Sequence, residues 1–176
     1  MGKKDEQNIN KIIEKAVQQA FEAGRQLATQ NSKDVYKATE RRLFALPILR
    51  AKLIEEQDDL SRLLEEQAPD IVVCSKDIVR FRRSGMRLSD DELFEAQITD
   101  LRGRIAAKTY EICEMERALK EIEHDAYHAA VIGRYIENMS DEVIGEKLHC
   151  DSSTVRRNRS RLVRKIAIWL YGPEAI

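Results

Sequence analysis

The chain has 176 residues, of which 35% are charged and 6% aromatic, and it contains only 7 glycines and 3 prolines. This composition favours long helices with charged outer faces over β-sheets. No apolar run approaches the roughly 18 to 20 residues that a membrane span needs, and the polar start of the chain predicts no secretory signal. We therefore expect an all-α, soluble, cytoplasmic protein without a membrane partner.

The three cysteines, Cys74, Cys113 and Cys150, are isolated from one another in the sequence. An odd, scattered set argues against a disulfide framework and fits a reducing compartment. No two of them have the CxxC spacing of a metal site, and the chain has no Gly-rich phosphate loop. The sequence therefore predicts neither a metal nor a cofactor.

The charges are unevenly distributed along a chain whose net charge is −1. Residues 151–165 have a local charge of +5 and residues 76–87 a local charge of +4, so the remainder is acidic. Two basic islands in an acidic body are typical of a protein that meets phosphate at defined places. The alternative is a solvated basic face without a partner.

An N-terminal helix is predicted from Asn8 to about Gln30, because apolar residues between Ile9 and Phe21 recur at helical spacing. The stripe that contains Ile12 and Phe21 is a candidate dimer surface.

A second helical pattern runs over residues 33–67, where Leu46, Leu53 and Leu60 recur every seven residues. Glu56 is a polar interruption of this apolar track. Pro47 lies inside the pattern, and because proline removes a backbone donor and clashes with the preceding turn, we expect a kink or a helix restart there.

Residues 71–87 lack helical rhythm and are predicted to form a loop with room for a short β-hairpin. Its basic residues are a candidate second contact, either with nucleic acid or with a protein surface such as the acidic part of the preceding helix. These residues are Lys76, Arg80, Arg82, Arg83 and Arg87.

A third helix is predicted to begin at Ser89, which forms a capping box with Glu92. Its apolar residues keep two heptad tracks, with Lys108 as the one charged member. The tracks are Phe94, Leu101, Lys108, Met115 and Ile122, and Ile98, Ile105, Ile112, Leu119 and Ala126. This pattern predicts a coiled coil. The partner helix is either the 33–67 helix or a second molecule, and the similar lengths and single connecting loop favour an intramolecular antiparallel hairpin.

Three shorter helical pieces follow the third helix. The first covers residues 125–137, with Ala129, Ile132 and Ile136 on one face, and ends at Asn138, which tolerates positive φ. The second begins at Ser140 as N-cap. Gly145 is costly inside a helix and indicates that another helix crosses closely there.

The last helix begins after the turn 149–151, with Asp151 as N-cap, and stops at Gly172. Its inner stripe is predicted to be Val155, Arg159, Leu162, Ile166 and Trp169 or Leu170. A short capped helix, a tight turn and a basic helix form the helix-turn-helix arrangement. The predicted organisation is thus an N-terminal helix (1–32), a long antiparallel coiled-coil hairpin (33–124) with a basic loop (68–88), and a C-terminal helix-turn-helix DNA-binding domain (125–176).

In a helix-turn-helix, the N-terminal end of the second helix points into the major groove. Arg156 and Arg157 are the best candidates for bidentate contact with guanine, and Arg161, Arg164 and Lys165 for neutralising backbone phosphates. The predicted DNA-binding residues are Ser152, Ser153, Thr154, Arg156, Arg157, Ser160, Arg161, Arg164 and Lys165.

At these residues the chain resembles a known group of proteins. The segments 135–148 (YIENMSDEVIGEKL) and 151–158 (DSSTVRRN) are similar to the region-4-like helix-turn-helix of sigma factors. They look more like the late-transcription regulators of the RinA/ArpU type in phages and prophages, as does the segment 36–47 (YKATERRLFALP).

This resemblance implies a cytoplasmic activator in a bacterial host, which binds a promoter ahead of phage late genes and helps host RNA polymerase. Two features depart from the group. His149 stands where this motif usually has Gly, and no region that would melt promoter DNA is evident. The second departure favours an accessory activator over a true sigma factor.

Two other functions compete with transcription regulation. A phage DNA-packaging protein of the small-terminase type also combines a helix-turn-helix with coiled coils, but tends to carry the DNA-binding part N-terminally. An enzyme is suggested only by His124 and His128, which superficially resemble HExxH but lack its Glu and an evident third ligand. No nucleophile–base pair is plausible, so no catalysis is expected.

A single helix-turn-helix reads only a few base pairs, so useful specificity needs two half-sites or a partner such as RNA polymerase. A homodimer is therefore a candidate state, and the Trp169–Leu170–Tyr171 end is a second candidate dimer surface beside the N-terminal stripe.

Overall fold

The computed structural model of the protein describes residues 3–30, 35–66 and 90–173. All regular structure within these ranges is helical, which confirms the all-α class. The helices are α1 (Lys3–Gln30), α2 (Val35–Glu66), α4 (Asp90–Lys120), α5 (His128–Val131), the π-helix η3 (Ile132–Ile136), α6 (Asp141–Leu148) and α7 (Ser152–Tyr171). The predicted 71–87 loop, with Lys76, Arg80, Arg82, Arg83 and Arg87, lies outside the described residues, as does Ser89.

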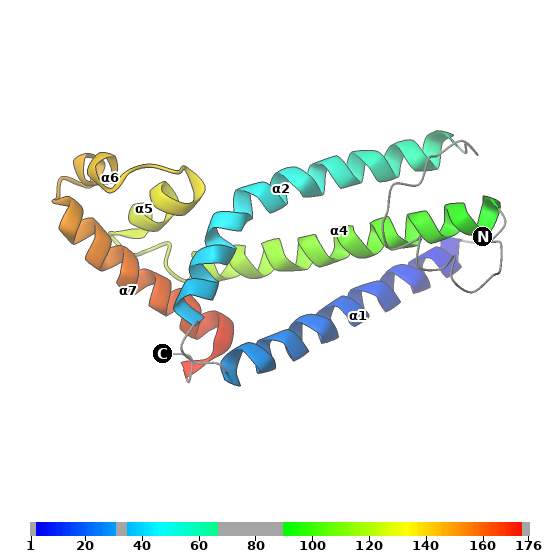
Figure 1. Cartoon of the computed structure of the whole chain (residues 1–176), viewed down its shortest axis with the longest axis horizontal. Helices are drawn as coiled ribbons and strands as arrows, with labels where there is room; N and C mark the ends of the chain where they lie inside the picture. The colour runs from blue at the N-terminus through cyan, green and yellow to red at the C-terminus, as the bar shows by residue number, and fades with distance from the viewer. Residues whose placement is uncertain (1–2, 31–34, 67–89, 174–176) are drawn as a thin grey trace.

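The three long helices lie side by side, with α4 in contact with both α1 and α2 (Figure 1). Ion pairs fix the direction of α2 against α4. Arg42 near the start of α2 pairs with Glu114 late in α4, whereas Glu56 further along α2 pairs with the earlier Lys108. The two helices therefore run antiparallel. None of the described helices combines the length and apolar character that crossing a membrane requires.

Pro47 lies inside α2, which continues through it as one helix from Val35 to Glu66. Of the two outcomes expected at Pro47, a kink or a restart, the restart does not occur. Figure 1 shows instead that α2 changes direction within its first half. A proline that lacks an amide donor and crowds the preceding turn is a usual cause of such a bend.

The two charged residues that interrupt the apolar tracks of α2 and α4 face each other. Lys108 Nζ lies 2.8 Å from Glu56 Oε1, and the two side chains are 18% and 13% exposed. Arg104 adds a longer contact of 3.6 Å to the same oxygen. Each interruption therefore supplies the counter-charge that the other needs in this partly buried seam.

α4 ends at Lys120, six residues before the predicted heptad track does. Residues 121–127 form turns, and from Ile122 on several amides bond three residues back, such as Ile122 N to Leu119 O at 3.1 Å and Asp125 N to Ile122 O at 3.0 Å. Ile122 stays buried, whereas Ala126 is exposed, so its predicted place in the seam is wrong.

The piece between α4 and α6 differs from the predicted helix 125–137. It consists of the single turn α5 and the π-helix η3, in which Glu137 N donates to Ile132 O at 3.1 Å. A π turn contains more residues than an α turn, so it rotates the buried face. Ala130, Val131 and Tyr135 are buried, while the predicted Ala129 is exposed and Ile132 and Ile136 are only half-buried.

One hydrophobic core joins the long helices to the C-terminal helices. It contains Leu43 and Leu46 of α2, side chains of α4, α5 and η3, and residues of α7. The other buried members are Ile112, Met115, Ala118, Leu119, Ile122, Val131, Tyr135, Leu162, Val163, Ile166 and Leu170. Burying a Leu or Ile side chain fully contributes about 1.5–3 kcal/mol, so this shared core holds α7 firmly against α2 and α4.

Candidate nucleic-acid interface

Local capping defines α6 and the turn that follows it. Ser140 has extended backbone geometry, and its hydroxyl accepts a hydrogen bond from Val143 N at 3.4 Å, which confirms it as the N-cap. Asn138 and His149 both have φ of 53°, which lies in the left-handed region. This conformation was predicted for Asn138. It was also expected for His149, which stands where the motif usually has glycine.

The turn between α6 and α7 explains Gly145. Cys150 N donates to Gly145 O at 2.9 Å, and a Cβ added at Gly145 would lie 2.6 Å from Cys150 O. The close neighbour is therefore the backbone of the turn, not a crossing helix as predicted. Asp151 is the N-cap of α7 through its backbone carbonyl, which accepts from Thr154 N and Val155 N, and its side chain makes no capping bond.

α7 divides into a core face and a solvent face. The core face includes Val163 and Ala167, which the predicted stripe lacked. Its buried residues are Val155, Leu162, Val163, Ile166, Ala167 and Leu170. Of the candidate end residues, Leu170 is buried and Trp169 is 40% exposed. α6 packs on α7, and Ile144 forms a second small core with Ala130 and Val155.

The solvent face of α7 carries most of the predicted DNA-binding side chains, and α7 contains no acidic residue. The exposed ones are Ser153, Arg156, Arg157, Arg161, Arg164 and Lys165. Ser152, Thr154 and Ser160 are half-buried. The exposed basic side chains form a basic surface on α7, while the buried apolar side chains lie in the core.

Arg156 and Arg157, the predicted base-reading pair, stand in different surroundings. The Arg156 side chain is 68% exposed, yet its Nε lies 3.5 Å from Asp141 Oδ2 at the start of α6. Arg157 is exposed one residue further along.

Asp141 also pairs with Arg159, which the inner stripe predicted correctly to point inward. The two side chains are 11% and 12% exposed, and Arg159 Nη1 donates to Asp141 Oδ1. Burial by itself raises the pKa of Asp141, but the hydrogen bond and charge of Arg159, assisted by Arg156 and Arg134, outweigh it and hold the pKa below its usual value. Asp141 therefore stays ionised and fixes α7 to α6.

Sequence reasoning missed this role of Asp141. It assigned the residue only to the acidic first turn of α6, where a carboxylate suits the helix dipole. Arg159 is 18 residues away on another helix, so no local spacing rule pairs the two.

Arg161 is held by an acid from the turn after α4. Its Nη2 lies 2.9 and 3.0 Å from the two carboxylate oxygens of Asp125. A backbone hydrogen bond from Tyr127 lowers the pKa of Asp125 most, burial opposes it, and Arg161 and Lys165 lower the pKa further. The guanidinium remains about half exposed and so can still face a phosphate.

The first turns of α2 border the basic surface. Tyr36 OH donates to Ser160 Oγ at 3.4 Å, and Tyr135 OH donates to Glu40 Oε1 at 2.6 Å. Burial raises the pKa of Tyr135, and the Glu40 carboxylate raises it further, so the phenol keeps its proton. The first contact joins α2 to α7, and the second joins α2 to η3.

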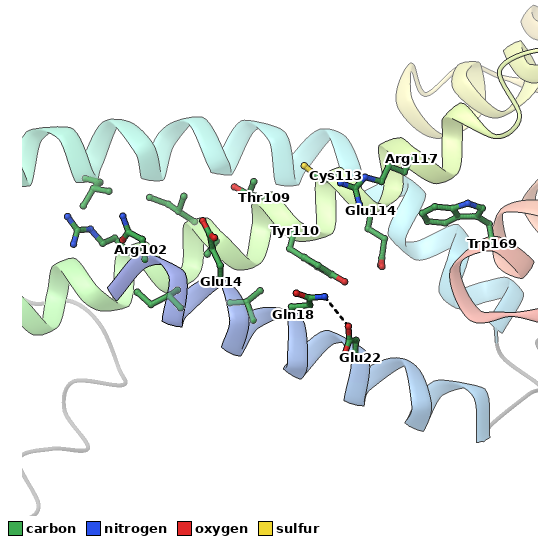
Figure 2. A pocket seen from close by; sticks show the side chains of 16 residues that line it. Glu14, Gln18, Glu22, Arg102, Thr109, Tyr110, Cys113, Glu114, Arg117 and Trp169 are labelled. Carbon is green, nitrogen blue, oxygen red and sulfur yellow. Dashed lines mark hydrogen bonds between the residues drawn. The ribbon is translucent and has the colours of Figure 1, made fainter. Parts of the chain in front are cut away.

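A groove of about 950 Å³ lies between α1 and α4 (Figure 2). Tyr110, Arg102 and Glu14 line it, and Trp169 of α7 closes one end. Phe21 packs on Tyr110 with ring centroids 4.8 Å apart, so part of the predicted N-terminal dimer stripe is covered by α4, whereas Ile12 is 67% exposed. The described residues contain no group of three or more acidic, His or Cys side chains placed to hold a metal ion.

His124 and His128 do not share a helix. His124 lies in the turns after α4, and His128 is the first residue of α5. The helical i, i+4 spacing on which the HExxH comparison depended is therefore absent.

No protein-family model matches the chain, and neither a curated protein nor a solved structure shows significant similarity to it.

Proposed function

We propose that the protein binds double-stranded DNA through α6 and α7, which act as a helix-turn-helix, and that it regulates transcription. One observation carries this proposal. The exposed side chains of α7 include Arg156, Arg157, Arg161, Arg164 and Lys165, whereas its apolar side chains lie in the core. A basic helix anchored along one side is the form in which a recognition helix enters the major groove.

The surroundings of each arginine suggest a division of roles. Arg157, exposed in the second turn of α7, is the first candidate for a bidentate contact with guanine. Arg156 can join it by turning from Asp141, or can remain oriented by that carboxylate while its outer nitrogens reach a base. Arg161, Arg164 and Lys165 lie further along α7 and suit contacts with phosphates, which set the register of the protein on DNA.

The long helices support a stable platform behind this surface. The antiparallel packing of α2 on α4, with Glu56 against Lys108, fits the coiled-coil hairpin expected from the heptads. The shared core then couples this hairpin to α7.

The regulatory role rests on the resemblance of residues 135–158 to phage late-transcription regulators. In this proposal the protein is an activator of phage late genes that acts with host RNA polymerase in the cytoplasm of a bacterial host, and it is not an enzyme.

The proposal is tested by selection from a pool of random duplexes at two salt concentrations, with wild type and the double variant Arg156→Ala/Arg157→Ala. A matched control is Arg50→Ala/Arg62→Ala, which removes the same charge from exposed positions of α2. We expect wild type and the control to recover one consensus that the α7 variant loses.

Salt-sensitive binding without a consensus would favour the DNA-packaging alternative, since phosphate contacts alone carry no sequence information. Absence of DNA binding by wild type would refute the proposal and leave α6–α7 as a protein-docking module.

A further inference from the structure

The outer face of α2 carries a second seam, distinct from the one that packs on α4. Arg41, Phe44, Ile48, Ala51 and Glu55 follow one another at spacings of three and four residues, and all five are exposed. This 3-4 spacing places them in one line along the helix. The line lies opposite the buried face that contains Leu43 and Leu46.

The middle of this seam is apolar. Phe44 is 43% and Ile48 61% exposed, and they are neighbours one turn apart on the helix. Phe44 is held in place by an edge contact with Tyr135, with ring centroids 4.7 Å apart. Adjacent exposed apolar side chains with a fixed geometry mark a surface that gains free energy when covered.

The ends of the seam carry opposite charges at equal distances from Ile48. Arg41 lies seven residues before Ile48 and Glu55 seven residues after it. Lys37 lies eleven residues before and Asp59 eleven residues after. All four charged residues are exposed.

We propose that this seam binds a second copy of the chain, with the two α2 helices antiparallel and a two-fold axis at Ile48. In such an isologous contact only Ile48, on the axis, meets its own counterpart, and a residue before it meets the residue at the same distance after it in the other copy. Arg41 of one copy then faces Glu55 of the other, twice, and the apolar centre meets itself. A parallel pairing would put like charges opposite each other, which is unfavourable.

The bend of α2 lies near the centre of this contact. Pro47 lies beside the apolar centre, and in the proposed dimer the two helices meet there, at the two-fold axis. Arg and Glu have long side chains that can span a gap between the helices at the charged ends, whereas short ones would not. The inference stands on α2 alone and does not depend on DNA binding.

Sedimentation analysis of the full chain tests the proposal with matched variants. Ile48 and Ile54 are both 61% exposed on α2, but only Ile48 lies in the seam. We expect the wild type to be a dimer. For Ile48→Asp we expect the dimer dissociation constant to increase by at least about a hundredfold, because each of the two copies places one Asp carboxylate in the contact. Ile54→Asp should dimerise as wild type does.

A charge exchange tests whether the occupant is a second copy of the chain. Arg41→Glu and Glu55→Arg should each be monomeric alone, since each puts two like charges opposite each other in a homodimer. Mixed in equal amounts they should form a heterodimer, because the two acidic ends of the first variant's seam then face the two basic ends of the second variant's seam. Three results would overturn the proposal: a monomeric wild type, equal effects of Ile48→Asp and Ile54→Asp, or a mixture of the charge variants that stays monomeric. This face of α2 would then bind another partner or another part of the same chain.

Discussion

Asp141 is the point at which two arginines of α7 meet the first turn of α6. Its carboxylate binds the buried Arg159 and lies 3.5 Å from the exposed Arg156. One residue therefore anchors the helix that we propose for DNA reading and also limits the orientation of one of its reading side chains.

Replacing Asp141 with Asn should lower the free energy of unfolding by about 3 kcal/mol, because it leaves the Arg159 charge buried without its partner. Urea unfolding at neutral pH measures this loss. Glu142→Gln is the control, since Glu142 is the next residue and is exposed to solvent. Equal unfolding midpoints for the Asp141 and Glu142 variants would contradict the anchoring role.

The pH dependence gives an independent check of the same ion pair. The pKa of Asp141 is lowered in the folded protein, whereas an aspartate in the unfolded chain has a pKa of about 3.9. In acid the folded state therefore binds fewer protons than the unfolded state. The stability from this pair is therefore complete above about pH 5 and is lost as the pH falls through the folded pKa. The difference in the free energy of unfolding between wild type and Asp141→Asn should therefore become smaller in acid. A difference in unfolding free energy that stays constant from neutral to acid pH would be inconsistent with this ion pair.

At the scale of single residues, local rules predicted well what depends on neighbours in the sequence. Ser140 as a cap and Asn138 at positive φ follow from their own chemistry and position, and both are found. The pairing of Asp141 with Arg159 depends on how two helices cross, which no local pattern contains.

Among the elements, the turn between α6 and α7 leaves no room for a side chain at Gly145. Gly145→Ala should destabilise the protein by about 2 kcal/mol, because the new Cβ meets the Cys150 carbonyl at 2.6 Å and the backbone of the turn must move. Thermal unfolding followed by circular dichroism measures the change.

Gly103→Ala in α4 is the opposite case and serves as the control. No atom lies within 4 Å of a Cβ at Gly103, so the substitution should stabilise the protein by about 0.5–1 kcal/mol through helix propensity alone. The turn would not require glycine if Gly145→Ala were as stable as Gly103→Ala.

The heptads of α4 and the capped start of α6 made these elements predictable, but their junction was not. The apolar track continues through Ile122 to Ala126, so periodicity alone extends the helix, while the turn hydrogen bonds of residues 121–127 end it. The π turn of η3 then shifts which residues are buried, and apolar spacing does not distinguish a π turn from an α turn. Glu56 and Lys108 were each recognised as interruptions, yet only the register of α2 against α4 pairs them.

For the whole molecule, Arg42 is the side chain that connects three helices. From α2 it binds Glu111 and Glu114 of α4, each at 2.5 Å, and its Nη1 donates to Tyr171 OH of α7 at 3.3 Å. Burial lowers the pKa of Arg42, but Glu111 outweighs this effect, so the guanidinium stays charged. It joins α7 to the long helices beside the hydrophobic core that they share.

This connection predicts that α7 and the long helices unfold together. Trp169, the only tryptophan of the chain, reports on α7, and circular dichroism reports mainly on the long helices α1, α2 and α4. Both signals should change at one denaturant concentration, which is the test of a single cooperative transition. Arg42→Met should shift both midpoints by the same amount, with a loss of about 3–5 kcal/mol, because it removes the guanidinium that pairs with Glu111 and with the buried Glu114.

Arg50→Met is the matched control for this prediction. Arg50 also joins α2 to α4, at 2.8 Å from Glu116, but both side chains are about half exposed, so its loss should cost less than about 1 kcal/mol. If tryptophan fluorescence changed before circular dichroism, α7 would unfold independently of the long helices. A recognition helix held only by its own small domain could reorient on DNA, whereas one that unfolds with α2 and α4 must present its basic face in the geometry that those helices impose.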